Sequence, residues 1–429
     1  MMTYQHTLDF LYSKLPMFTR VGAVALKKDL HNTIEMCKAL DNPQHKFKSI
    51  HVAGTNGKGS TSHMLAAILQ KAGYKTGLYT SPHLKDFRER IRINGKMAPK
   101  SFVTTFVKNQ KTNIEKIEPS FFEVTVAMAF DYFTKEKVDI AVIEVGLGGR
   151  LDSTNIITPK LSVITNISLD HTNILGDTLA EIAFEKAGII KKNIPVVIGE
   201  KHPDTINIFK EKARAENAPI YFAQDELVIE SSSIKNTSLI IDISKNSEDL
   251  FSNLALDLTG TYQQKNILTV IQSILKLREL GFIINDEAIY KGLKNVKAIT
   301  GLQGRWQTLA KNPLIICDTG HNKAGITEVL KNIKNTNYQK LHMVIGMVKD
   351  KDIDGVLALL PENALYYFCQ PNLERALPSI ELAQIAAKHN LKGKAFVSVQ
   401  EAFQNAKENA NDNDLIFVGG STFVVAEIL

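Results

Sequence analysis

Short apolar runs alternate with longer helical patterns along most of this chain, and this alternation leaves few folds open to it. Through the N-terminal two-thirds, runs rich in β-branched residues are separated by segments with helical spacing of apolar residues. Strands that alternate with helices in this way form a mostly parallel sheet with helices packed on its faces. The expected strands of this region are residues 48–53, 75–80, 138–145, 161–167 and 195–199.

The C-terminal part repeats this alternation, and its expected strands are residues 314–318, 341–346, 364–369, 395–399 and 415–418. Between the two alternations, residues 220–258 show a period-two pattern that predicts a small antiparallel addition, followed by a helix over residues 263–280. Residues 294–304 form the expected linker. We therefore predict an α/β fold with a larger N-terminal domain (residues 1–296) and a smaller, Rossmann-like α/β domain (residues 301–429).

Composition excludes several classes of protein. The 51 basic and 45 acidic residues give a net charge of +6 with no concentrated basic tract, which argues against a nucleic-acid partner. No run approaches the roughly 18 apolar residues of a membrane span. The three cysteines are far apart and form no C-x-x-C pair, which favours a reducing compartment over a disulfide or zinc scaffold. We expect a cytoplasmic monomer without nucleic-acid or membrane partners.

A glycine-rich loop follows the first expected strand and consists of Gly54, Thr55, Asn56, Gly57, Lys58, Gly59 and Ser60. Its spacing departs from G-x-x-x-x-G-K-[ST], because Val52 stands at the first glycine position and Gly59 separates the lysine from the serine. Glycines let the backbone approach phosphate oxygens, and amides at a helix start bind their charge. A turn with glycines for steric reasons alone is the alternative. The lysine and serine at the helix start favour a P-loop-type ATPase domain.

Polar residues also follow the other expected strands. Ser81 and His83 come after the second strand, Glu144 ends the third, and His171 follows the fourth. Because the carboxyl ends of parallel strands meet at one edge of a sheet, we expect these side chains to converge on the loop. Glu144 suits Mg²⁺, which prefers oxygen ligands, and a pair with a lysine or an arginine such as Arg150 is the less favoured alternative for a buried carboxylate. An imidazole is not a preferred magnesium ligand, so a structural role for His171 stays open.

Two further segments allow alternatives. In residues 85–96, Arg88, Arg90 and Arg92 fall at period two on a possible strand that Asn94-Gly95 would end as a hairpin turn. This pattern is typical either of an edge strand protected by charge or of a clamp for an anionic ligand. The pair Glu185-Lys186 is, from the residues alone, a solvated pair on a helix.

Together these motifs resemble those of the folylpolyglutamate synthases and dihydrofolate synthases of the Mur ligase superfamily. The matching segments are GTNGKGS (54–60), YTSPHL (79–84), FRERIRING (87–95), EVGLGGRLDSTN (144–155), SLDH (168–171), EKAGIIK (185–191), GR (304–305), DTGHN (318–322) and KDKD (349–352). The resemblance covers nearly the whole chain. It implies that residues 1–296 are an ATP-binding domain with folate-binding loops and that residues 301–429 are a glutamate ligase domain.

The resemblance also implies an activity. The chain would be an ATP- and Mg²⁺-dependent ligase that adds L-glutamate to a pteroyl substrate through an acyl phosphate, releasing ADP and phosphate. Both dihydropteroate and reduced folate are expected as substrates, because many bacterial members are bifunctional. The alternatives are a Mur-type ligase for a cell-wall UDP-sugar peptide and, from a different class, a P-loop ATPase switch.

Residue roles follow from the same resemblance. The residues implied to contact ATP are the loop residues 54–60 with Gln263, Asn266, Arg305, Asp318 and His321; the magnesium ligands, for two ions, are Ser81, Glu144 and His171; the catalytic residues are Lys58, Glu144, His171 and Lys186, the last as a carbamate; and those near the folate are His83, Phe87, Arg88 and Arg90. The sequence departs from the family pattern at Tyr262, where a histidine is frequent, and at Thr319-Gly320 and Lys323 in the usual D-G-A-H-N-P.

Overall fold

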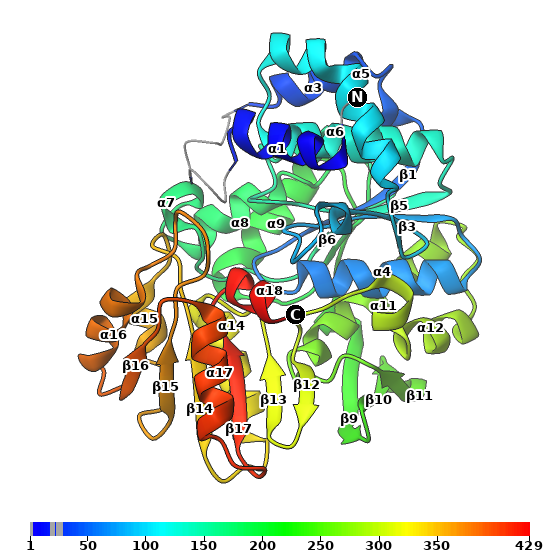
Figure 1. Ribbon diagram of the computed structural model, residues 1–429. Coiled ribbons are helices and arrows are strands. Elements are labelled where there is room, and N and C mark those ends of the chain that lie inside the picture. Colours follow the sequence, from blue (N-terminus) through cyan, green and yellow to red (C-terminus); the bar gives the residue numbers. More distant parts are fainter. Residues whose placement is uncertain (1–2, 18–21, 23–28) are drawn as a thin grey trace. The chain divides into compact units, whose positions relative to one another are not determined.

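The computed structural model describes residues 3–17, 22 and 29–429 of the chain (Figure 1). It divides into two compact units. The larger comprises Met1–Ser168, Thr172–Asp257 and Gln263–Leu302, and the smaller comprises Leu169–His171, Leu258–Tyr262 and Gln303–Leu429. The functional domains expected from the sequence stay predictions. The compact units differ from these expected domains, because Leu169–His171 and Leu258–Tyr262 belong to the smaller unit together with the C-terminal part.

Within the described residues, the larger unit contains an eight-stranded sheet of order β4-β3-β2-β5-β1-β6-β7-β8. Its strands are β1 (Lys48–Ala53), β2 (Thr76–Tyr79), β3 (Ile91–Ile93), β4 (Lys96–Met97), β5 (Ile140–Glu144), β6 (Leu161–Ile164), β7 (Val196–Ile198) and β8 (Ile220–Phe222). In this order, every neighbouring pair from β2 to β8 is parallel. The pairs β2–β3 and β3–β4 are antiparallel. The predicted mostly parallel sheet is confirmed.

The β3–β4 hairpin turns at Asn94-Gly95, as predicted, and both residues have positive φ (47° and 74°). Such a turn requires φ above zero at both central positions, which Asn and Gly tolerate best. The expected strand through three arginines was wrong, however. Arg88 and Arg90 lie in the 3-10 turn η3 (Phe87–Arg90), and only Arg92 lies in a strand. The side chain of Asp86 caps η3 and therefore stabilises the turn over the strand.

Helix α4 (Lys58–Lys71) begins directly after the glycine loop and is buried against two layers. It contacts β1, β2 and β5 of the sheet and also α11 (Gln263–Glu279), α12 (Asp286–Leu293) and α13 (Val296–Thr300) (Figure 1). Every residue from Ser60 to Leu69 is buried. The close packing needs a glycine, because a Cβ at Gly292 would lie 2.8 Å from the Cα of Ile68.

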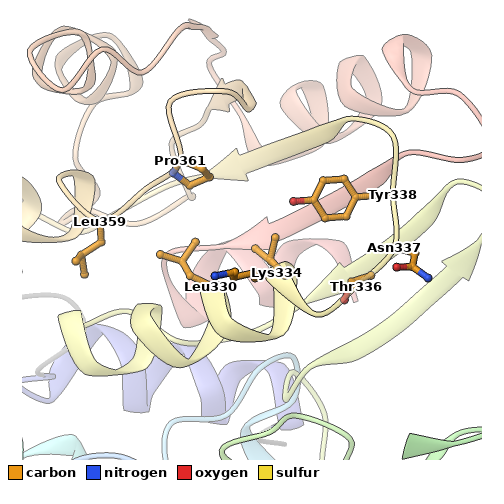
Figure 2. A pocket seen from close by; sticks show the side chains of 8 residues that line it. Leu330, Lys334, Thr336, Asn337, Tyr338, Leu359 and Pro361 are labelled. Carbon is orange, nitrogen blue, oxygen red and sulfur yellow. The ribbon is translucent and has the colours of Figure 1, made fainter.

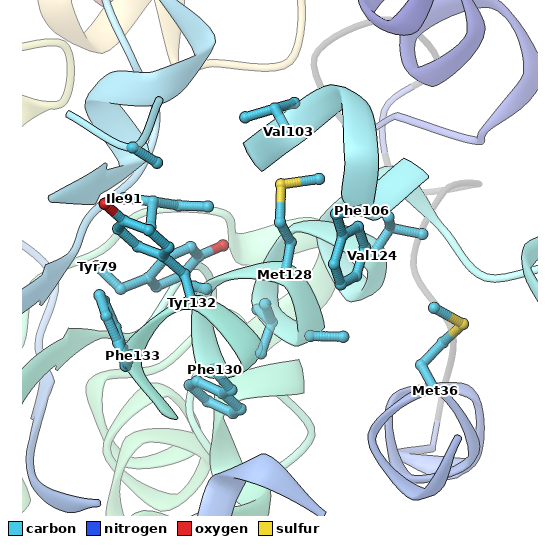
Figure 3. Close-up of a cluster of buried hydrophobic side chains, with 14 of the residues drawn as sticks. Met36, Tyr79, Ile91, Val103, Phe106, Val124, Met128, Phe130, Tyr132 and Phe133 are labelled. Carbon is cyan, nitrogen blue, oxygen red and sulfur yellow. The ribbon is translucent and has the colours of Figure 1, made fainter. Parts of the chain in front are cut away.

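The remaining helices of the larger unit pack around the sheet. They are α1 (Tyr4–Lys14), α3 (His31–Lys38), α5 (Lys100–Ile117), α6 (Phe121–Lys135), α7 (Thr172–Leu175), α8 (Leu179–Ala187), α9 (Pro203–Ala215) and α10 (Ala223–Glu226), with the 3-10 turns η2 (Pro43–His45) and η4 (Ser153–Ile156). Figure 3 shows part of the buried core, to which Met128 and Phe130 of α6, Val103 and Phe106 of α5 and Tyr79 of β2 contribute. A capping box between Ser120 and Glu123 starts α6.

The predicted antiparallel addition is confirmed as a three-stranded sheet of order β11-β10-β9. Its strands are β9 (Leu227–Lys235), β10 (Ser238–Lys245) and β11 (Glu248–Leu256). The helix expected over residues 263–280 is α11.

The smaller unit, all of whose residues the structure describes, contains a six-stranded sheet of order β12-β13-β17-β14-β15-β16. Its elements are β12 (Gln307–Lys311), β13 (Leu314–Cys317), α14 (Lys323–Lys334), β14 (Leu341–Ile345), α15 (Ile353–Leu357), β15 (Leu365–Phe368), α16 (Ser379–Ala387), β16 (Gly393–Ala395), α17 (Val399–Asn409), β17 (Leu415–Gly419) and α18 (Thr422–Ile428). Only β12 pairs antiparallel, so the predicted α/β class is confirmed. The strand expected at residues 395–399 was misplaced, because Ser398 caps α17. No helix in the described part of the chain is long and apolar enough to span a membrane.

Replacing Gly292 by alanine tests the packing of α12 on α4. The added methyl group would force the two helices apart, and overpacking of this kind costs about 2 kcal/mol of unfolding free energy. Urea denaturation of Gly292→Ala should show this loss. Replacement of the exposed Lys294 by alanine is the control and should change stability by less than about 0.5 kcal/mol. Equal stability of both variants would contradict the close contact.

Candidate active site

The glycine loop between β1 and α4 is held by close backbone contacts on two sides. Gly54 has φ +147°, and a Cβ there would lie 1.8 Å from the Oγ1 of Thr165. Gly57 has φ +84°, and its Cβ would lie 2.3 Å from the Oδ1 of Asn266. Side chains are excluded at both positions. The steric alternative therefore explains the two glycines, but it does not explain the lysine that follows.

The backbone amides of the loop face different directions. The N–H of Thr55 donates to the carbonyl of Asn166 at 2.9 Å, and the N–H of Asn56 donates to the Oδ1 of Asn166 at 3.0 Å. Helix α4 begins at Lys58, so the amides of Lys58, Gly59 and Ser60 belong to its first turn, where N–H groups have no acceptor within the helix. These first-turn amides are suited to phosphate oxygens. Direct contact of Thr55 or Asn56 with ATP stays a prediction.

Two lysines lie on the same loop. The ammonium of Lys58 donates to the carbonyls of Gly54 at 3.1 Å and Thr55 at 3.2 Å. The ammonium of Lys186, near the end of α8, donates to the Gly54 carbonyl at 3.0 Å and is only 3% exposed. The interpretation of Glu185-Lys186 as a solvated pair was therefore wrong for Lys186. The local sequence could not distinguish a solvated lysine from a buried one. Lys186 is buried because it contacts the glycine loop, which lies 132 positions away along the chain.

Glu144 and Ser81 meet at the same edge of the sheet. Glu144 is buried at the end of β5, and its Oε2 accepts the N–H of Ser81 at 3.2 Å. The guanidinium of Arg150 binds Glu185 at 2.8 Å, so the structure does not support Arg150 as the partner of Glu144. A carboxylate beside a serine is an oxygen-rich arrangement of the kind that Mg²⁺ binds.

His171 belongs to the smaller unit, in a polar cluster around Asp170. The carboxylate of Asp170 accepts Lys351 Nζ at 2.6 Å and Asn322 Nδ2 at 3.0 Å, and it lies 3.4 Å from His321 Nε2. Burial raises the pKa of the Asp170 carboxyl, but the hydrogen bond and charge of His321 and the charge of Lys351 outweigh burial and hold that pKa well below its usual range. Lys351 Nζ also lies 3.2 Å from His171 Nε2.

The first turn of α11 supports the start of α4. Gln263 is fully buried, and its Nε2 donates to the Oγ of Ser60 at 3.1 Å. Asn266 donates in turn to the Oε1 of Gln263 at 2.8 Å. The structure thus places these two residues against the glycine loop and α4. Their direct contact with the nucleotide stays a prediction.

The residues expected near the folate are engaged with their own segment. Arg90 is buried, donates to the Nδ1 of His83 at 2.8 Å and lies 5.3 Å from the ring centre of Phe121. Burial, together with the charge of Arg90, lowers the pKa of His83 to about 3, so this ring is neutral at pH 7. Phe87 is buried beside it, and Arg88 binds Asp86 at 2.7 Å. Substrate contact by these four residues stays a prediction.

In the smaller unit, two predicted ATP-contacting residues are held by the residues that depart from the family pattern. Asp318 accepts the hydroxyl of Tyr262 at 2.6 Å and the N–H of Trp306 at 2.7 Å. Arg305 donates to the hydroxyl of Thr319. Burial, with the charge of Asp318 beside it, raises the pKa of Tyr262 well above its usual value, so the phenol keeps the proton that it donates.

A groove of about 600 Å³ lies elsewhere in the smaller unit (Figure 2). It is lined by Leu330, Ile333, Lys334, Thr336, Asn337, Tyr338, Leu359 and Pro361. Residues 336–338 precede β14, so the groove lies at the amino ends of the strands. Parallel sheets bind ligands at the opposite edge, and the groove contains none of the predicted site residues.

The sequence prediction missed residues of the loop environment, among them Asn166, which bonds Thr55 and Asn56. Asn166 follows β6 by two residues. The rule that polar residues at strand ends form the site would have found it. The expected strand 161–167 ran three residues too far and concealed this position.

His51, in β1, makes the unfolding free energy of the protein depend on pH. It is fully buried and bonds the hydroxyl of Thr154 at 2.8 Å, and burial followed by the charge of Lys191 lowers its pKa to about 3. A neutral histidine with a folded pKa below the unfolded value of about 6.5 contributes stability above pH 6.5. That contribution decreases as the pH falls from about 6.5 towards 3.

We therefore expect the wild-type protein to lose about 2 kcal/mol of unfolding free energy through His51 between pH 6.5 and 5, since each pH unit contributes about 1.4 kcal/mol. The difference in slope between wild type and His51→Gln in urea denaturation isolates this term. Replacement of His6, which is exposed, by glutamine is the control and should keep the wild-type slope. Equal slopes for all three proteins would show that His51 does not contribute.

Comparisons with known proteins show to which family this chain is similar. The Mur ligase middle domain matches residues 52–274, and the Mur ligase glutamate ligase domain matches residues 304–422. The dihydrofolate synthase/folylpolyglutamate synthase of Bacillus subtilis (strain 168) is 31% identical over 435 residues, which cover 99% of this chain and 98% of that protein. The structure of E. coli FolC in complex with DHPP and ADP has a TM-score of 0.86 at 30% identity, covering 99% of this chain and 96% of that one.

A probable bifunctional folylpolyglutamate synthase/dihydropteroate synthase of Haloferax volcanii is 32% identical over 99% of this chain. This chain spans only 50% of the length of that protein, so the match concerns half of it. The Bacillus subtilis protein, in contrast, is matched over 98% of its own length. The chain therefore belongs to the folylpolyglutamate synthase/dihydrofolate synthase family of the Mur ligases.

Proposed function

We propose that this chain uses ATP to join L-glutamate to pteroyl substrates, acting on both dihydropteroate and reduced folate. The observation that carries the proposal is the loop between β1 and α4. There, Lys58 and Lys186 both bind the Gly54 carbonyl beside the first-turn amides of α4. Two cations and a helix N-terminus at one loop favour a polyphosphate ligand. The E. coli relative was solved with ADP and DHPP, which supports a nucleotide and a small organic substrate.

The residues present fit magnesium. In the described part of the chain, no group of three or more His, Cys, Asp or Glu side chains is arranged to hold a metal. Mg²⁺ needs few protein ligands, however, because water and phosphate oxygens complete its octahedron. We propose Glu144 and Ser81 for one ion and His171 as a ligand of a second. When bound, Mg²⁺ supplies positive charge that neutralises the phosphate oxygens.

Lys186 is the proposed site of carbamylation. A carbamate would convert its buried amine into a carboxylate beside the loop, which would supply an oxygen ligand to the second magnesium. The observation that supports this proposal is its burial next to the Gly54 carbonyl.

The proposed reaction needs no protein nucleophile. A carboxylate oxygen of the pteroyl substrate attacks the γ-phosphorus of ATP, the bond to the bridging oxygen breaks, and ADP leaves with that oxygen. The amine of L-glutamate then attacks the acyl carbonyl carbon, and phosphate leaves as the amide forms and the amine releases a proton. Lys58 and the amides of α4 hold the transferred phosphate in line, so catalysis consists of positioning and charge stabilisation.

Replacing Lys58 by alanine removes one of the two cations at the loop. We expect glutamate ligation to fall by about 100-fold or more, as for other groups that stabilise charge in a transition state. Glu144→Ala should have a loss of the same order. Circular dichroism should show that both variants stay folded. The control is Lys71→Ala at the exposed far end of α4, which should keep wild-type activity. Activity within about twofold of wild type in Lys58→Ala would refute its role.

A parallel assay tests the substrate assignment. Purified protein is offered ATP and L-glutamate with dihydropteroate or tetrahydrofolate, each labelled with ¹⁸O in its carboxylate. We expect a glutamyl product and ADP from both substrates, with one ¹⁸O atom in the released phosphate. A uridine-nucleotide peptide, the substrate type of the cell-wall ligases, is the control and should give no product. ATP hydrolysis without any amide product would favour a P-loop ATPase switch instead.

A further inference from the structure

Asn166 contacts the ATP-binding loop through both its backbone and its side chain. Its carbonyl accepts the N–H of Thr55 at 2.9 Å, and its Oδ1 accepts the N–H of Asn56 at 3.0 Å. Its Nδ2 donates to the Oε1 of Glu200 at 3.1 Å. The orientation of this amide therefore decides whether the loop N–H of Asn56 meets an acceptor or a donor.

Glu200 stands just after β7 and joins two supports of the loop. Its own N–H donates to the carbonyl of Thr165 at 3.0 Å, which fixes its backbone beside the end of β6. Its Oε2 binds the ammonium of Lys265 at 2.9 Å. Lys265 lies in the first turn of α11, next to Asn266, whose Oδ1 would be 2.3 Å from a Cβ at Gly57. Glu200 thus links the end of β6 to the first turn of α11, and both of these contact the loop.

The chemistry of a carboxylate makes this contact directional. An ionised carboxylate only accepts hydrogen bonds, so it accepts the Nδ2 of Asn166 and repels the amide oxygen. This turns the Oδ1 of Asn166 towards the N–H of Asn56. If the amide flipped, the Nδ2 would face that N–H, and a half-buried donor would lose its acceptor.

We propose that Glu200 is a positioning residue for nucleotide binding, because it orients the Asn166 amide and, with Lys265, fixes the loop between Gly54 and Lys58. This inference rests on the proposed role of the loop in holding the phosphates of ATP. Glu200 itself does not touch the phosphates in this scheme. It acts through Asn166 and through the first turn of α11.

The test compares Glu200→Leu, Glu200→Gln and wild type by calorimetric titration with ADP and by steady-state kinetics. Glu200→Leu should weaken ADP binding about tenfold and raise the KM for ATP similarly, with the KM values for the pteroyl substrate and L-glutamate within about twofold of wild type. Glu200→Gln keeps an acceptor for the Asn166 amide, so its ADP affinity should fall by about threefold or less.

Glu216→Leu is the matched control. Glu216 belongs to the same unit, pairs with Lys212 and has a side chain that is 28% exposed, compared with 24% for Glu200. It lies at the end of α9, far along the chain from the loop residues that Glu200 supports. Its replacement should leave ADP affinity within about twofold of wild type.

A double-mutant cycle separates positioning from a general loss of structure. Because Glu200 acts partly through Asn166, Glu200→Leu should weaken ADP binding less in the Asn166→Ala variant than in wild type, so the two changes combine to less than the product of their separate effects. The proposal is overturned if Glu200→Leu binds ADP as tightly as wild type. It is overturned equally if the two changes multiply, or if all KM values rise together. If wild type itself binds no ADP, the proposed function fails rather than this inference.

Discussion

The burial of α4 between the sheet and a layer of helices governs the geometry of the glycine loop that precedes it. A helix packed on one side could shift, but α4 contacts three strands and also α11, α12 and α13. Glycines at both ends of this arrangement remove the side chains that would separate the layers. Gly54 and Gly57 let the loop lie against Thr165 and Asn266, and Gly292 lets α12 approach α4. The backbone of the loop therefore lies directly against these side chains, and their packing fixes its shape.

The charged groups of the site are already bound to the protein's own polar atoms. Lys58 and Lys186 share the Gly54 carbonyl, and Arg90 is bonded to a neutral His83. Buried charges that lacked such partners would destabilise the fold by several kcal/mol. In the proposed reaction, the same contacts hold the cations in place before a substrate arrives, which reduces the reorganisation that the reaction requires. In this family member, stability and preorganisation are therefore produced by the same hydrogen bonds.

The departures from the family pattern in the smaller unit share one physical property. Tyr262 donates to Asp318, Thr319 accepts from Arg305, and the ammonium of Lys323 binds the carboxylate of Asp352 at 2.8 Å. Each changed residue thus contacts a residue of a matched motif. Such contacts explain how the chain differs at these positions while it keeps the motif side chains ordered.

Local patterns were sufficient for the fold class, most strand positions, the Asn94-Gly95 turn and the glycine loop, because periodicity, turn preference and glycine content are properties of neighbouring residues. They were insufficient for the burial of Lys186, the 3-10 turn at Arg90 and the contacts of Asn166 with Glu200. Each of these depends on partners brought together by the packing of distant segments, such as the 34 residues between Asn166 and Glu200. A sequence indicates which polar groups stand at the ends of strands. Which of them bind one another, and which way an amide is turned, follows only when the strands lie side by side and each buried donor must find an acceptor.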